Sequence, residues 1–118
     1  MIRVLVVDDH ELVRSGISRL LSDSKGIEVV GQAASGEDAV QWVRNDTPDV
    51  ILMDIHMPGI GGLEATRKIL RTHPAVHVIA VTALDDNPYA ERLMQAGASG
   101  YITKGADADD MITSLMKV

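Results

Sequence analysis

The stretch Asp49-Val50-Ile51-Leu52-Met53-Asp54 ends a continuous apolar run with a carboxylate. The run is short, contains β-branched side chains, and is followed by a turn signal at Met57-Pro58-Gly59. These features predict a buried β-strand that ends at Asp54. An aspartate in that position is either a turn residue or a reactive group, and the rest of the sequence has to distinguish the two.

Apolar segments of the same kind alternate with segments of helical periodicity along the whole chain. Strands are expected at residues 2–7, 27–34, 49–54, 76–82 and 99–103. Helices are expected at about 10–23, from a Ser35 cap to Thr47-Pro48, at about 63–72, from Asn87 to Gly97, and at 107–118. The apolar stripe of the first helix comprises Leu12, Val13, Ile17, Leu20 and Leu21.

This alternation predicts one α/β domain over residues 1–118, with a parallel sheet between two layers of helices. Right-handed crossovers leave few topologies. A flavodoxin-like (βα)5 doubly wound sandwich with strand order 2-1-3-4-5 suits the length. In such a sheet a functional site lies beyond the carboxyl ends of the strands, at the switch point between strands one and three.

Composition excludes several classes of function. The net charge of −6 disfavours non-specific nucleic-acid binding, and 3% aromatic residues disfavour a base-stacking platform. The absence of cysteine excludes disulfides and thiolate zinc sites, and the four histidines (10, 56, 73 and 77) show no metal-ligand spacing. The N-terminal apolar run is too short for a signal peptide or a membrane span, so a cytoplasmic location without membrane contact is expected.

Chemically competent side chains stand where the predicted strands end. They are Asp8 and Asp9 after the first strand, Asp54 on the third, Thr82 on the fourth and Lys104 after the fifth. Taken singly, each has an ordinary explanation, such as a helix cap, a turn residue or a surface lysine. Because the carboxyl ends of parallel strands share one edge, their joint placement favours a functional site.

Charge then indicates the chemistry of that edge. Three carboxylates repel one another, which raises pKa values or requires a cation, and Lys104 supplies only one positive charge. Mg²⁺ suits the negative charge that Lys104 leaves uncompensated, because it binds through one or two carboxylates, keeps several waters and binds phosphate. Asp54 beside Mg²⁺ and Lys104 can attack phosphorus and form an aspartyl phosphate.

The same motifs resemble the receiver domains of two-component response regulators along the entire chain. The residues that carry the resemblance are Val7-Asp8-Asp9-His10, the segment 52–59, Val81-Thr82-Ala83 and Tyr101-Ile102-Thr103-Lys104. Finer features at 9–14, 59–67 and 94–98 resemble the NarL/FixJ class, and within it the GacA/UvrY-type global regulators. In that family a sensor histidine kinase donates a phosphoryl group to the central aspartate.

The resemblance implies a role for each matching acidic residue. Asp54 would be the phospho-acceptor. Asp9 would bind Mg²⁺ directly and Asp8 mostly through water, and the backbone carbonyl of His56 would be another metal ligand. The chain would assist its own phosphorylation and dephosphorylation without being an enzyme in the usual sense.

The resemblance also implies a switch. Lys104 would bind a phosphoryl oxygen, Thr82 would move to hydrogen-bond the phosphoryl group, and Tyr101 would swing inward after it. Many receivers have a proline after the lysine, where this chain has Gly105. This departure affects how rigidly Lys104 is placed.

The C-terminal segment predicts a longer natural protein. Its apolar periodicity continues at Leu115, Met116 and Val118 without a stop signal. Relatives of the NarL/FixJ class continue to a helix-turn-helix DNA-binding domain, so DNA binding is expected only in that missing part. Homodimerisation on phosphorylation, through the first and fifth helices or the fourth-helix face, is a further expectation.

Two other classes of function stay open on the residues alone. A Mg²⁺-dependent phosphohydrolase with an aspartate nucleophile usually has a carboxylate two residues later, where this chain has His56. A receiver-like module that only docks partners is the other. The acidic pair Asp8-Asp9, together with Thr82 and Lys104, argues against that second class.

Overall fold

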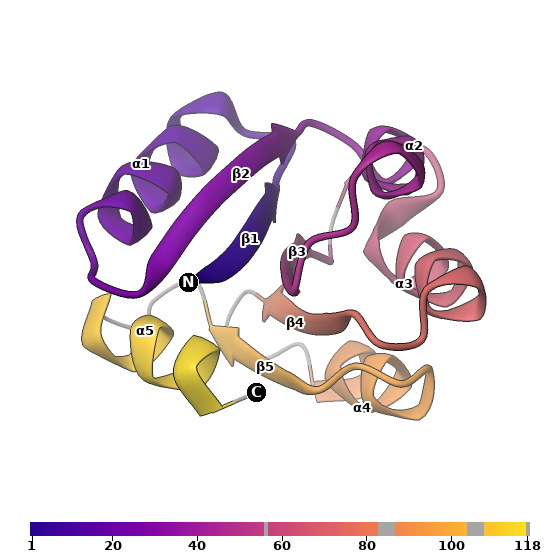
Figure 1. Cartoon of the computed structure of the whole chain (residues 1–118). Coiled ribbons are helices and arrows are strands. Elements are labelled where there is room, and N and C mark those ends of the chain that lie inside the picture. Colours follow the sequence, from indigo (N-terminus) through magenta and orange to yellow (C-terminus); the bar gives the residue numbers. More distant parts are fainter. Residues whose placement is uncertain (56, 83–86, 104–107, 118) are drawn as a thin grey trace.

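In the computed structural model, which describes residues 1–55, 57–82, 87–103 and 108–117, five strands alternate with five helices (Figure 1). The strands are β1 (Ile2–Val7), β2 (Ile27–Ala33), β3 (Val50–Asp54), β4 (His77–Thr82) and β5 (Gly100–Thr103). The helices are α1 (Glu11–Ser22), α2 (Gly36–Asn45), α3 (Gly61–Thr72), α4 (Asn87–Gln95) and α5 (Ala108–Lys117). None of the described helices is long and apolar enough to cross a membrane.

The strands form a parallel sheet in the order β2-β1-β3-β4-β5, which confirms the predicted flavodoxin-like topology. Helices α1 and α5 cover one face, and α2, α3 and α4 cover the other (Figure 1). β2 is an edge strand, and its Glu28 and Gln32 side chains are exposed. The central strands are buried on both faces because each face has a helical layer over it.

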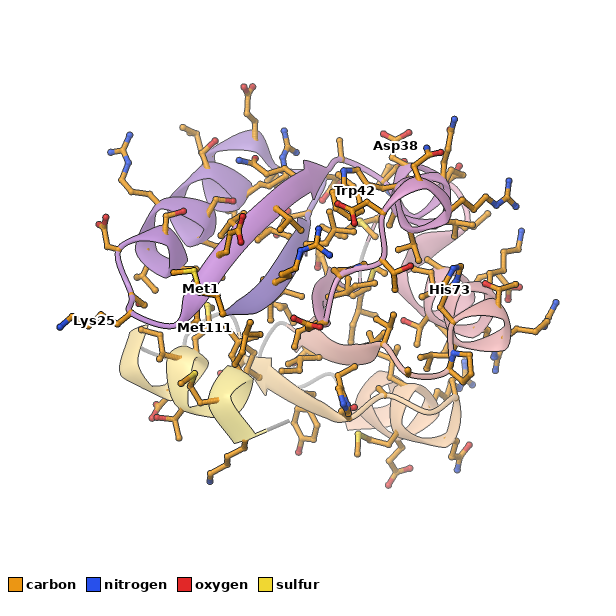
Figure 2. All side chains as sticks on the ribbon, in the orientation of Figure 1. Met1, Lys25, Asp38, Trp42, His73 and Met111 are labelled. Atoms are coloured by element: carbon orange, nitrogen blue, oxygen red, sulfur yellow. The ribbon has the colours of Figure 1, made fainter. Side chains whose placement is uncertain are left out.

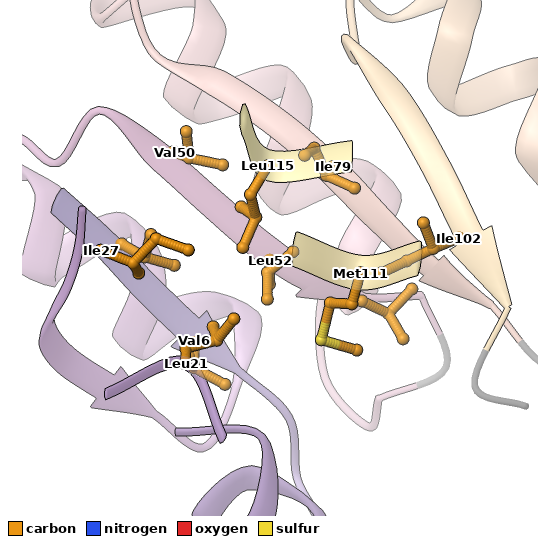
Figure 3. Close-up of a cluster of buried hydrophobic side chains, with 11 residues drawn as sticks. Val6, Leu21, Ile27, Val50, Leu52, Ile79, Ile102, Met111 and Leu115 are labelled. Carbon is orange, nitrogen blue, oxygen red and sulfur yellow. The ribbon is translucent and has the colours of Figure 1, made fainter. Parts of the chain in front are cut away.

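Alternate residues of the central strands supply the two halves of the core. On one face, Val6, Leu52 and Ile79 pack with Leu21 of α1 and Leu115 of α5 (Figure 3). The residues between them point the other way, because successive side chains of a strand alternate. They meet α2 and α3 in a second cluster that contains Leu5, Val7, Ile51, Met53, Ala39, Val43, Ala65 and Ile69.

Helix α2 begins as the sequence predicts. The Ser35 side chain accepts a hydrogen bond from the backbone N–H of Asp38 at 3.1 Å. This satisfies one of the N–H groups that the first turn of a helix leaves without a partner. Glu37 and Asp38 also place negative charge at the positive end of the helix dipole.

The apolar stripe of α1 is buried in the later turns of the helix and exposed in its first turn. Ile17 and Leu20 are partly buried against the core and Leu21 is fully buried, but Leu12 is 89% exposed and Val13 is also exposed. Arg14, at the end of the first turn, donates a hydrogen bond to the Asp8 carbonyl. The predicted amphipathic helix is present, and the part of its apolar stripe that packs on the core is formed by Ile17, Leu20 and Leu21.

Candidate functional site

The chain turns away from β1 through two aspartates. The backbone N–H of Asp8 still donates to the Ala33 carbonyl of β2 at 3.1 Å, so Asp8 continues the line of the strand. Its Oδ1 accepts a hydrogen bond from the backbone N–H of His10 at 2.8 Å, which shapes the turn into α1. Asp8 is buried and Asp9 is partly buried. Both carboxylates are thus held at the carboxyl end of β1.

The third aspartate ends the neighbouring strand. Val7 of β1 pairs with Met53 of β3, so the next residues along the two strands, Asp8 and Asp54, lie beside each other. Asp54 is 1% exposed. Ligand atoms of Asp8, Asp9, His10 and Asp54 all lie within 4.8 Å of one another. The structure therefore brings together the three carboxylates that the sequence predicts for the switch point.

This arrangement has the chemistry of a dication site. Two of the three carboxylates are almost completely buried, and charges taken out of water need a counter-charge. Carboxylate oxygens are the ligands of hard dications. A metal–oxygen distance of about 2.1 Å allows ligand atoms up to about 4.2 Å apart, a span close to that of the cluster. The residues present therefore fit a Mg²⁺-sized ion.

The other predicted residues are only partly described. Thr82 ends β4 in a buried position, one residue past the Val81 that pairs with Asp54. Tyr101 on β5 is 51% exposed. Lys104 and His56 lie outside the described residues, so their predicted roles stay predictions.

A glycine lets α3 begin directly against the end of β3. A Cβ atom on Gly62 would lie 2.3 Å from the Asp54 carbonyl oxygen and 2.9 Å from the Ile55 Cα. The Gly62 N–H donates to the Ile55 carbonyl at 3.2 Å, which fastens the two segments together. The helix expected from about residue 63 thus begins two residues earlier, and Gly62 lies in its first turn against the backbone of Asp54.

The single tryptophan packs against β2 and lines a cavity there. The Trp42 ring lies so close to Gly31 of β2 that a Cβ atom there would be 2.5 Å from it; Trp42 sits on the side of α2 nearest β2 (Figure 2). Trp42 lines a cavity of about 450 Å³ together with Arg14 and Gln32. Arg14 Nε donates to Gln32 at 3.1 Å and Nη1 donates to the Asp8 carbonyl at 2.7 Å.

Sequence reasoning missed His10 as a member of the cluster. The spacing of the four histidines pairs His10 with no other histidine. Its position directly after Asp8-Asp9 was the available signal. In the structure its Nδ1 lies 3.1 Å from Asp9 Oδ1 and 3.5 Å from Asp8 Oδ1.

Comparisons with known proteins agree with this geometry. Residues 4–116 match the family model of the response regulator receiver domain. The chain is 58% identical to the response regulator GacA of Pseudomonas viridiflava, in a match that covers all of this chain and 55% of GacA. It is 56% identical to the response regulator UvrY of Escherichia coli K12, again over all of this chain, and the match covers 54% of UvrY. The chain thus spans about half the length of the curated relatives it matches.

A solved structure has the same fold. It is a two-component response regulator of the LuxR family from Aurantimonas, 37% identical, with a TM-score of 0.92. The match covers 98% of this chain and 82% of that one.

Proposed function

The chain belongs to the family of response regulator receiver domains, and on that premise we propose that it accepts a phosphoryl group on Asp54 from a sensor histidine kinase. The observation that carries the proposal is the position of Asp54 at the end of β3, 1% exposed and beside two further carboxylates. A nucleophile needs its reaction partner brought close and in line. At this edge of the sheet Asp54 would meet a phosphoryl group and its cation together.

Asp8, Asp9 and Asp54 would hold Mg²⁺, with Asp9 as a direct ligand and Asp8 acting mostly through water. The backbone carbonyl of His56, a residue outside the described ranges, would be another ligand. When bound, the ion offsets the carboxylate charges and the charge on the phosphoryl oxygens. The buried position of Asp8 and Asp54 strengthens these electrostatic interactions, since little water screens them.

The covalent step transfers the phosphoryl group between two side chains. One carboxylate oxygen of Asp54 forms a bond to phosphorus while the bond from phosphorus to the donor imidazole of the kinase breaks, and the imidazole keeps that electron pair. The acyl phosphate is later cleaved by water, which releases inorganic phosphate and restores the Asp54 carboxylate. The chain assists both steps and turns over no separate substrate.

Residues on β4 and after β5 would read the phosphoryl group. The Thr82 hydroxyl, buried at the end of β4, would donate a hydrogen bond to a phosphoryl oxygen, and Lys104 would bind another. Tyr101, exposed on β5, would turn inward into the space that Thr82 leaves. A local change in charge is thereby converted into a change of the β4–β5 face.

The signal would pass to an output domain outside this chain. The GacA and UvrY relatives are about twice as long as this chain, which supports a further segment in the complete protein, and we propose that this segment is a helix-turn-helix DNA-binding domain. Contact with DNA would belong to that domain, because the segment here carries a net charge of −6. Phosphorylation would favour a homodimer, and the cysteine-free composition suits the reducing cytoplasm.

Incubation with Mg²⁺ and acetyl phosphate tests the proposal. Intact-mass measurement should show one added phosphoryl group. Trp42 fluorescence should change with it, because Trp42 lines a cavity with Arg14, and Arg14 donates a hydrogen bond to the Asp8 carbonyl. Asp54→Asn should abolish both signals. Asp49→Asn is the matched control, since Asp49 precedes the same strand at its other end and accepts a hydrogen bond from the Arg3 N–H.

The other outcomes separate the competing functions. Phosphorylation that persists in Asp54→Asn would overturn the assignment of the acceptor. Fast release of phosphate from many small phosphomonoesters would identify a phosphohydrolase instead. Absence of any adduct with acetyl phosphate, and of any response to beryllofluoride, would identify a module that docks partners without phosphorylation.

A further inference from the structure

His10 lies against the group formed by Asp8, Asp9 and Asp54, which we call the acidic cluster. Its Nδ1 is 3.1 Å from Asp9 Oδ1 and 3.5 Å from Asp8 Oδ1. A ring nitrogen of His10 is also within 4.8 Å of a ligand atom on each of the three aspartates. The residue is held there by its backbone, since its N–H donates to Asp8 Oδ1 at 2.8 Å.

The contact between His10 and Asp9 has the length of a hydrogen bond but not its direction. Within the part of the chain that the structure describes, Asp9 Oδ1 is a buried atom that accepts no hydrogen bond, although Nδ1 is 3.1 Å away. A hydrogen bond requires the N–H to point at its acceptor. Ligands of one metal ion instead point at the ion between them.

The spacing suits that second arrangement. In an octahedral site with bonds of about 2.1 Å, neighbouring ligand atoms are about 3.0 Å apart. The distances of 3.1 and 3.5 Å from His10 Nδ1 to the two aspartates are near this value. One cation can therefore touch the imidazole and the acidic cluster together.

We propose that His10 Nδ1 is a further metal ligand of this site and that it raises the affinity for first-row transition dications relative to Mg²⁺. Imidazole nitrogen is a favourable ligand for Co²⁺, Ni²⁺ and Zn²⁺, whereas Mg²⁺ prefers oxygen and keeps its waters. The proposal rests on the proposed function only in that the acidic cluster binds a dication. It does not require phosphorylation of Asp54.

The structure of α1 allows His10 to serve this purpose. The helix begins at Glu11, and the His10 side chain makes no capping hydrogen bond. The side chain is 66% exposed, so an ion from solvent can reach it. Asparagine is a favoured residue immediately before a helix, so the variant His10→Asn should keep the fold while removing the imidazole.

Metal titration of the 118-residue chain tests the proposal. Calorimetry gives the Kd for Mg²⁺ and for Co²⁺, and the visible absorption of bound Co²⁺ reports its ligands directly. His10→Asn should raise the Kd for Co²⁺ by about tenfold or more, because even the loss of a residue that only orients a metal ligand costs about that much. The Kd for Mg²⁺ should stay within about twofold. His73→Asn is the matched control and should change neither value.

Three results would overturn the proposal, and they differ from failure of the proposed function. An equal loss for both ions would make His10 only an electrostatic neighbour of Asp9. An unchanged Kd and an unchanged Co²⁺ spectrum in His10→Asn would exclude the imidazole as a ligand. Absence of any ion binding in the unaltered chain would overturn this proposal and the Mg²⁺ role together. A chain that binds ions but takes no phosphoryl group on Asp54 would overturn only the proposed function.

Discussion

The substitution Gly62→Ala measures how tightly α3 is packed against the strand that carries Asp54. The new methyl group would lie 2.3 Å from the Asp54 carbonyl oxygen, 2.9 Å from the Ile55 Cα and 3.1 Å from the Asp54 carbonyl carbon. All three atoms belong to the backbone of a buried strand and its continuation, so no side chain can rotate away. The start of α3 must move instead.

The expected change in stability combines two opposing terms. Overpacking of this kind typically destabilises by about 1–3 kcal/mol, while alanine favours a helix over glycine by up to about 1 kcal/mol. The net loss should be about 1–2 kcal/mol. For a domain of this size, Tm should fall by roughly 4–8 °C.

Gly16→Ala is the control for this experiment. Gly16 lies inside α1, and no heavy atom would come within 4 Å of its Cβ. The same substitution should therefore raise stability there, by up to about 1 kcal/mol. Urea unfolding followed by circular dichroism measures both variants, and acetyl phosphate labelling should be slower in Gly62→Ala alone because the backbone of Asp54 is displaced.

An increase in stability for both variants would refute the reasoning. It would mean that the end of β3 yields to the methyl group without loss, so that Gly62 does not position Asp54. A fall in the stability of both variants would mean that alanine is not favoured over glycine in α1. The difference in stability between the two variants would then measure the effect of the close contact at Gly62.

Three further substitutions test the fold around the site. Ser35→Ala removes the acceptor for the Asp38 N–H and should destabilise by about 1 kcal/mol in urea unfolding; Ser35→Asn should restore most of it. Leu115→Ala empties a fully buried position beneath the sheet and should cost about 2–5 kcal/mol by the same assay, and a loss below 1 kcal/mol would contradict the packing of α5. Gly31→Ala places a methyl group 2.5 Å from the Trp42 ring, so it should shift the fluorescence of Trp42 and lower Tm; an unaltered emission spectrum would contradict the contact.

Much of the architecture follows from local patterns. The central strands β1, β3 and β4 are mostly apolar because both of their faces are buried, and β2 carries the exposed polar residues Glu28 and Gln32 because it lies at the edge. Ser35 predicts the start of α2 because its side chain satisfies a backbone N–H group next to it in sequence. Such short-range causes are visible in the sequence without any knowledge of the fold.

The candidate site depends on one further step, from strand order to neighbouring strand ends. Asp8 and Asp54 are distant in sequence, yet a parallel sheet with β1 beside β3 must place them together. The closeness of Asp8, Asp9 and Asp54 therefore follows from strand order alone. The exposure of Leu12 could not be predicted in this way. Periodicity shows which side of a helix is apolar, but it does not show whether another element covers that side at a given turn.

Asp54 shows which properties of the site are readable from the sequence and which depend on the tertiary structure. Its place at the end of a buried apolar strand is readable from residues 49–54, because burial and strand length are local properties of the chain. The approach of Gly62 to its backbone and the direction of the His10 ring toward its neighbours are not readable in that way. Both depend on distances of a few ångströms between segments that meet only after folding, and packing of the whole domain sets those distances.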